Sequence, residues 1–186
     1  MNGRLGQIRT DALAAGYIYT KKLDRINGWS IVTNVLTILV PILFSGALLI
    51  AKGTSYEDAI NVISIVLSAF LLAIVVFTLI LKVDQEKESS LIARRSNFYV
   101  ANEALKLQNS SESELIWFYN FVNEMDSRDK ENLGSVSEAL KQEAYRESLK
   151  KFIPGSKDTV CSVCHASPFI YKKGSCQLCG NTPATT

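Results

Sequence analysis

The sequence predicts an all-α integral membrane protein with a two-helix transmembrane hairpin, a cytoplasmic helical bundle or stalk and a small C-terminal zinc ribbon. Three observations lead there: two long apolar spans without charge, helical spacing of apolar residues outside them, and four cysteines confined to the last 26 of 186 residues. The predicted boundaries are 1–28 for an N-terminal cytoplasmic helix, 29–81 for the hairpin, 82–152 for the cytoplasmic helical region and 153–186 for a linker and the ribbon.

The two apolar spans are Trp29–Ile50 and Ile60–Leu81 (29–50 and 60–81). Each has 22 residues and no charged side chain. A helix of that length reaches roughly 33 Å, enough to cross a hydrocarbon core about 30 Å thick. The alternative is a buried helix pair in a soluble bundle. That alternative is disfavoured because a soluble helix of this length normally has a polar face.

Lysine and arginine residues near the spans predict the orientation. Residues 1–28 contain five, the connecting loop 51–59 contains only Lys52, and the segment directly after the second span contains four. Basic residues concentrate on the cytoplasmic side of a membrane. We therefore expect both termini in the cytoplasm and the short loop on the opposite side.

Apolar residues at spacings of three and four predict further helices outside the spans. One is expected over 7–26. The absence of Gly and Pro from Glu57 to Asn109 allows the second span to continue as one helix to about Leu107. Two later helix starts have the capping-box pattern of a serine three residues before a glutamate, namely Ser111 with Glu114 and Ser135 with Glu138.

All four cysteines belong to the pattern C-x2-C-x11-C-x2-C, formed by Cys161, Cys164, Cys176 and Cys179. Two C-x-x-C pairs can place four thiolates around one tetrahedral ion, because each two-residue gap lets both thiolates face it. The predicted compartment is reducing, so stable disulfides are not expected. Zn2+ is the favoured cofactor, and rubredoxin-like iron, which uses the same ligands, stays open as the rival metal.

Other interpretations of the cysteine tail are weaker. No βαβ pattern surrounds either C-x-x-C pair, which disfavours a thioredoxin-type redox site. His165 is interpreted as a bystander, since four thiolates already complete the tetrahedron. A strand at Phe169–Tyr171 is expected to lead into a turn at Gly174. Lys172 and Lys173 could contact nucleic acid, although a solvated ribbon tip is the favoured interpretation.

Polar residues recur along one face of each span. They are Thr33, Asn34, Thr37 and Ser45 in the first span and Asn61, Ser64 and Ser68 in the second. Such residues usually mark helix–helix contact in a membrane. The alternative is a water-lined membrane seam, which a two-helix chain can form only as a homo-oligomer.

Two parts of the sequence resemble known families. The charged stretch Tyr19-Thr-Lys-Lys-Leu-Asp-Arg-Ile-Asn-Gly-Trp29, two spans and a cytoplasmic helical hairpin resemble the bacterial SLATT effector domains. The C-x2-C-x11-C-x2-C tail is similar to a group of mobile-element proteins named for that spacing. The resemblance implies a bacterial inner-membrane protein of antiviral defence. It also implies oligomers that breach the membrane, and no catalytic residues.

The expected function is accordingly not enzymatic. The chain has one histidine and no phosphate-binding glycine loop, nucleophile elbow or H-E-x-x-H motif. We expect a membrane effector of a bacterial anti-phage or conflict system, which disrupts the inner membrane on a cytoplasmic signal. The alternative is a non-toxic anchor that presents the ribbon to a partner. Expected partners are the lipid bilayer, further copies of the chain, and a sensor protein or nucleic acid at the ribbon.

Overall fold

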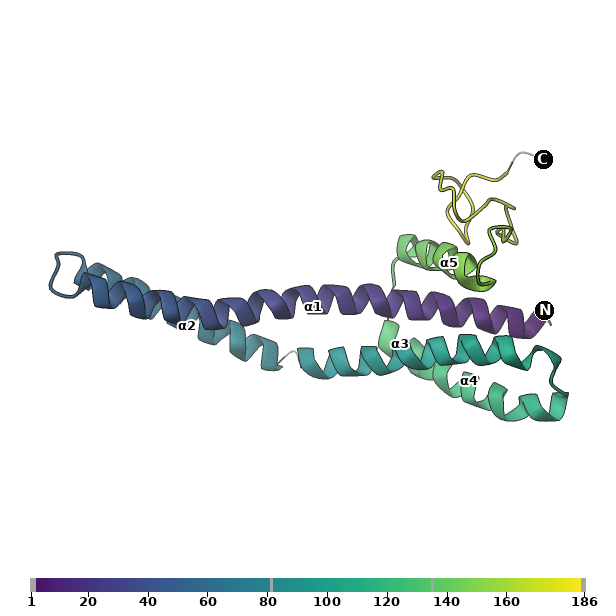
Figure 1. Ribbon diagram of the computed structural model, residues 1–186, viewed down its shortest axis with the longest axis horizontal. Coiled ribbons are helices and arrows are strands. Elements are labelled where there is room, and N and C mark those ends of the chain that lie inside the picture. Colours follow the sequence, from purple (N-terminus) through teal and green to yellow (C-terminus); the bar gives the residue numbers. More distant parts are fainter. Residues whose placement is uncertain (1–2, 81, 135, 185–186) are drawn as a thin grey trace. The chain divides into compact units, whose positions relative to one another are not determined.

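The computed structural model describes residues 3–80, 82–134 and 136–184 (Figure 1). Their helices are α1 (Gly3–Ala51), α2 (Glu57–Ile80), α3 (Val83–Lys106), a short 3-10 turn (Leu107–Asn109), α4 (Glu112–Leu133) and α5 (Glu138–Phe152). The described residues contain no strand, so the all-helical prediction is confirmed. The predicted span end at Leu81 and the predicted cap Ser135 lie outside the described residues.

The chain divides into two compact units. The hairpin unit is Leu23–Glu88, and the head unit combines Met1–Lys22 with Ser89–Thr186. In the hairpin unit the second part of α1 and the whole of α2 run antiparallel, joined by a turn in which Gly53 has a φ of +77°. Gly53 N–H donates to the Glu57 carboxylate at 2.7 Å, which fixes the start of α2.

Both hairpin helices are long and apolar enough to cross a membrane, judged by length and composition. Their large apolar side chains are exposed along most of their length, for example Leu49 at 77%, Ile50 at 84% and Ile65 at 70%. Little of either apolar stretch is therefore covered by the rest of the chain, unlike the core helix of a soluble protein.

Helix boundaries differ from the sequence prediction in two places. The expected helix over 7–26 and the first span are one continuous helix, because the backbone passes Gly28 and Pro41 without a break. The expected single helix from Glu57 to Leu107 is wrong. It is interrupted at Lys82, whose φ of +50° lies in the left-handed region, where the α-helical hydrogen-bond pattern cannot continue.

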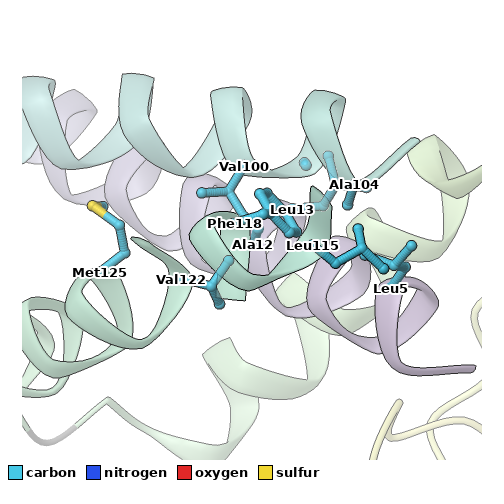
Figure 2. Packing of buried hydrophobic residues seen from close by; sticks show 10 residues of the cluster. Leu5, Ala12, Leu13, Val100, Ala104, Leu115, Phe118, Val122 and Met125 are labelled. Atoms are coloured by element: carbon cyan, nitrogen blue, oxygen red, sulfur yellow. The ribbon is translucent and has the colours of Figure 1, made fainter. Parts of the chain in front are cut away.

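The core of the head unit lies where α1, α3 and α4 meet (Figure 2). Phe118 is fully buried at its centre, between small residues that allow close helix approach. Its members are Leu5, Ala12, Leu13, Val100, Ala101, Ala104, Leu115, Phe118, Val122 and Met125. The buried face of α3 is partly polar: Ser90 and Asn97 are buried, whereas Leu105 is exposed.

Asp129 of α4 forms a buried polar link between three helices. Its two carboxylate oxygens accept hydrogen bonds from the Tyr19 hydroxyl of α1 and the Asn97 amide of α3, both at 2.8 Å. Burial and the neighbouring carboxylate together raise the pKa of Tyr19, so the phenol stays a donor at neutral pH. The link therefore sets the register of α1, α3 and α4 in a way that apolar contacts alone do not.

Arg9 of α1 forms a second buried link, to α3 and α5. Its side chain is 2% exposed, and its guanidinium donates to the backbone carbonyls of Ala101, Lys151 and Phe152. Desolvation lowers the pKa of Arg9, although a guanidinium keeps its charge. The two α5 carbonyls belong to the last turn of that helix, which has no helical donors for them and favours positive charge.

Helix caps agree with one of the two predicted boxes. The Glu114 carboxylate accepts from the Ser111 N–H at 2.8 Å, as predicted, and this hydrogen bond lowers the pKa of Glu114. The α5 helix begins two residues later than the Ser135 box implies. Its N-cap is Ser137, whose hydroxyl accepts from the Leu140 N–H at 3.4 Å, because the helix starts at Glu138 itself.

Arg9→Ala should destabilise the head unit by about 2–4 kcal/mol, because it leaves the buried Ala101 carbonyl and the half-buried last carbonyls of α5 without their donor. Urea unfolding followed by circular dichroism measures this loss. Arg95→Ala, at an exposed position of α3, is the control and should change stability by less than about 0.5 kcal/mol. Equal effects of the two substitutions would contradict the assigned role of Arg9.

Candidate metal centre

The four cysteines converge on one point. Their sulfur atoms all lie within 4.8 Å of one another, and all four residues are buried. The Cys161–Cys176 and Cys164–Cys179 sulfur pairs are 3.9 Å and 3.3 Å apart. A tetrahedral ion with metal–sulfur bonds of about 2.3 Å requires sulfur–sulfur distances near 3.8 Å. The cluster therefore fits one four-coordinate metal ion, as the spacing predicted.

The two C-x-x-C segments form matching knuckles. In each, the N–H of the residue after the second cysteine donates to the carbonyl of the first: His165 to Cys161 at 3.0 Å, and Gly180 to Cys176 at 2.8 Å. Both donors have positive φ, +54° for His165 and +66° for Gly180. This backbone reversal turns both thiols of a knuckle to the same side, and it is the role that the structure gives to the exposed His165.

Backbone N–H groups also prepare the second knuckle for a metal. Burial by itself would raise the pKa of the Cys176 thiol. Hydrogen bonds from the backbone N–H groups of Cys179 and Leu178, and from the Cys179 and Cys164 thiols, act in the opposite direction and bring that pKa down to about 7. A thiolate is the form that binds a metal, so the knuckle supplies one ligand that is already partly ionised at neutral pH.

Asn181 organises the loop between the knuckles and is not among the site residues predicted from the sequence. It is 1% exposed; its oxygen accepts from the Lys172 N–H at 2.6 Å and its amide donates to the carbonyls of Ser167 and Ile170. These three hydrogen bonds hold the loop in place without the backbone pairing of a β-sheet. Asparagine in a cysteine-rich tail gives no signal of its own, because its partners lie 9–14 residues away.

The predicted ribbon strand at Phe169–Tyr171 is wrong. Within the described residues the tail has a single isolated β-bridge, between Lys173 and Asn181. A loop of eleven residues can close on the Asn181 side chain instead of on a ladder of backbone pairs. Gly174 is the tight point of this closure: a Cβ there would lie 2.3 Å from the Thr182 backbone nitrogen.

The α5 helix carries the cysteine module. Arg146 donates to the carbonyl of Cys179, and its guanidinium lies 4.0 Å from the centre of the Tyr171 ring. Leu149 packs directly on the cysteines. The cysteine module is thus part of the head unit: it packs on α5 and does not form a separate small domain.

Comparison with known protein families places the chain as a whole. The family model described as "Mobilome CxxCx(11)CxxC protein" matches residues 2–182. The chain belongs to this mobilome CxxCx(11)CxxC protein family. No curated protein and no solved structure matches it. The match covers both units and bears out the resemblance of the tail to mobile-element proteins, whereas it does not confirm the SLATT resemblance.

The polar residues predicted as a membrane seam of this mobilome protein lie in the hairpin unit. Asn34, Thr37, Ser45, Asn61 and Ser68 are exposed, whereas Thr33 and Ser64 are half-buried. The hydroxyls of Thr33, Thr37 and Ser45 donate to carbonyls of their own helix. The Ser64 hydroxyl is buried and has no partner among the described residues. Their role as a seam stays a prediction.

Gly174→Ala should prevent the loop between the two knuckles of the cysteine module from folding back on Asn181 and Thr182. The new methyl group would meet main-chain atoms of these two residues, which cannot rotate away. We expect metal affinity to fall by about tenfold or more, as for other outer-shell changes at metal sites. Competition with a chromogenic chelator measures this affinity. Ser175→Ala, at the exposed neighbouring position, is the control. Unchanged metal retention in the glycine variant would contradict the close approach.

Proposed function

We propose that the chain is an inner-membrane effector of a bacterial mobile-element or anti-phage conflict system, with both termini in the cytoplasm. In this proposal the hairpin unit inserts into the bilayer and further copies of the chain associate through its polar face. A cytoplasmic signal received by the head unit changes this assembly so that it disrupts the membrane. The chain performs no chemical reaction.

One observation carries the proposal: the hairpin unit exposes both its apolar surface and most of its polar residues. Exposed leucine and isoleucine side chains over two helices of this length suit lipid better than water. Five of the seven seam residues are also exposed and do not face the neighbouring helix of the same chain. In lipid an exposed amide such as that of Asn34 needs a partner, which a second copy would supply.

We further propose that the four cysteines bind Zn2+. Four thiolates at tetrahedral distances in a reducing compartment favour zinc, which prefers four-coordinate sulfur sites and takes no part in redox reactions. When bound, the ion would close the module by joining its two knuckles. The module buries little apolar surface of its own, so this bond energy would supply much of its stability.

A second candidate function is a non-toxic anchor whose cysteine module recruits a partner. It is supported by apolar side chains that the module leaves exposed, notably Val163 at 61% and Ile170 at 66%. The two functions differ in the role of the hairpin unit. In the anchor it only holds the head unit at the membrane, and substitutions on its polar face should be silent.

The purified full chain should contain about one zinc per polypeptide, and Cys176→Ser should remove it while the chain stays in the membrane fraction. Elemental analysis that separates zinc from iron is the measurement. Ser162→Ala, inside the first knuckle but not a ligand, is the control and should keep its metal. One equivalent of iron would show that the site binds iron and would contradict the zinc proposal. A metal-free wild-type chain would contradict the metal site itself.

Asn34→Leu should abolish membrane depolarisation by the expressed protein, since it removes an amide that needs a partner in lipid. A potential-sensitive dye in cells that also carry the neighbouring genes and a phage trigger provides the readout. Val35→Leu, an apolar exchange at the adjacent exposed position, should depolarise like the wild type. If a packing role is all that Asn34 has, its replacement should be mild, because membrane hydrogen bonds average about 0.6 kcal/mol.

A wild-type chain that never depolarises cells under these conditions would exclude the effector and leave the anchor. Membrane insertion itself is checked separately by extraction with carbonate, which should leave the full chain in the pellet.

A further inference from the structure

The head unit contains a pocket of about 500 Å³ beside the metal centre. Its walls come mainly from α1, α4, α5 and the second cysteine knuckle, where Gln177 and Leu178 stand between two of the metal ligands. Pockets of roughly 300–1,000 Å³ are the size that holds small organic ligands. Neither the metal centre nor the hairpin unit uses this space.

Most of the wall is apolar. The side chains that give it this character come from four different segments of the head unit: Ala14, Ala15, Ile18, Leu133, Tyr145 and Leu178. Such a surface favours a ligand with a hydrocarbon or aromatic body and does not suit a bare metal ion or a small hydrated anion.

One wall carries concentrated negative charge. Asp11, Asp126 and Asp129 line it, and no cation lies within ion-pair distance of them in the described part of the chain. Burial and the charge of Asp126 raise the pKa of Asp11 to about 6, and burial and Asp129 raise the pKa of Asp126. At neutral pH these carboxylates therefore repel one another, with only Lys130 acting against this at Asp126.

Asn97 adds a hydrogen-bond acceptor to the same wall. Its side chain is 4% exposed, and its amide N–H groups donate to the Ala93 carbonyl and to Asp129. No described group donates to its side-chain oxygen. Because Asn97 lines the pocket, its side-chain oxygen offers one more acceptor for a group that carries N–H.

We propose that this pocket binds a small organic cation, an ammonium or guanidinium group on an apolar or aromatic body. The positive group would lie against Asp11 and Asp126 and donate to Asn97, and the body would fill the space between α1 and α5. Because Leu178 lies between Cys176 and Cys179, the bound molecule would touch the metal knuckle itself. The proposal rests on head-unit contacts alone and is independent of what the hairpin unit does to a membrane.

Three indole compounds with the same two-carbon arm and end groups of different charge test the proposal: tryptamine as the cation, tryptophol as the neutral alcohol and indole-3-propionate as the anion. Each is titrated by calorimetry into the zinc-loaded full chain in detergent, against detergent alone. We expect tryptamine to bind with a Kd of about 1 mM or tighter, as its size allows. Tryptophol should bind at least about tenfold more weakly, and the anion not measurably.

Two variants locate the binding. Asp126→Asn should weaken tryptamine binding about tenfold and leave tryptophol unchanged, whereas Glu131→Gln, the same chemical change elsewhere on α4, should alter neither. Ala15→Phe should exclude all three compounds by filling the space; circular dichroism checks its fold. Equal binding of tryptamine and tryptophol, tryptamine binding that Asp126→Asn leaves intact, or no tryptamine binding to the wild type would each overturn the proposal.

Discussion

The buried guanidinium of Arg9 is the interaction on which the head unit depends. It connects the first helix to the carbonyl of Ala101 in α3 and to the last two carbonyls of α5, across 92 to 143 residues of sequence. The last carbonyls of a helix have no donor within the helix itself. Arg9 supplies those donors together with the positive charge that a helix C-terminus favours. The position of α5 is thereby fixed by a residue near the start of the chain.

The position of α5 in turn determines where the candidate metal centre lies in the head unit. Its knuckles are closed locally, by backbone bonds and by Asn181, but its floor is α5, through Arg146 and Leu149. A cysteine module of this size has almost no core of its own. Its order therefore comes from two sources, the ion that its thiolates can hold and the helix beneath it. Displacement of α5 would disturb the four cysteines directly, because Arg146 and Leu149 contact their module.

The polar residues of the head unit have a second consequence. Asp129 is held between Tyr19 and Asn97, so one carboxylate is committed to joining α1, α3 and α4. That leaves Asp11 and Asp126 beside it, and among the described residues neither has a partner of opposite charge in ion-pair contact. A protein fold tolerates such an arrangement at a modest loss of stability, and it is common where a ligand supplies the missing charge. The same hydrogen-bonded Asp129 thus sets the helix register and contributes to the negative charge of the proposed cation pocket.

The sequence by itself determined the features that depend on composition or on near neighbours. Two charge-free stretches of 22 residues define helices able to cross a membrane, four cysteines at fixed spacing define a tetrahedral ligand set, and Ser111 with Glu114 defines a helix start. Each of these is a property of residues that lie close together in the chain, so no knowledge of the fold was needed.

Only the tertiary structure decided the rest. In the sequence Arg9 is indistinguishable from the other basic residues of the N-terminal segment, and its buried role depends on its contact with α5. Asp129 and Asn97 likewise look like surface residues, and their burial depends on the packing of α1. The left-handed turn at Lys82, the replacement of a ribbon strand by Asn181 and the pocket beside Leu178 are likewise invisible to periodicity. Their physical reason is common: each depends on contacts between distant segments, or on a backbone conformation that the residue type does not demand.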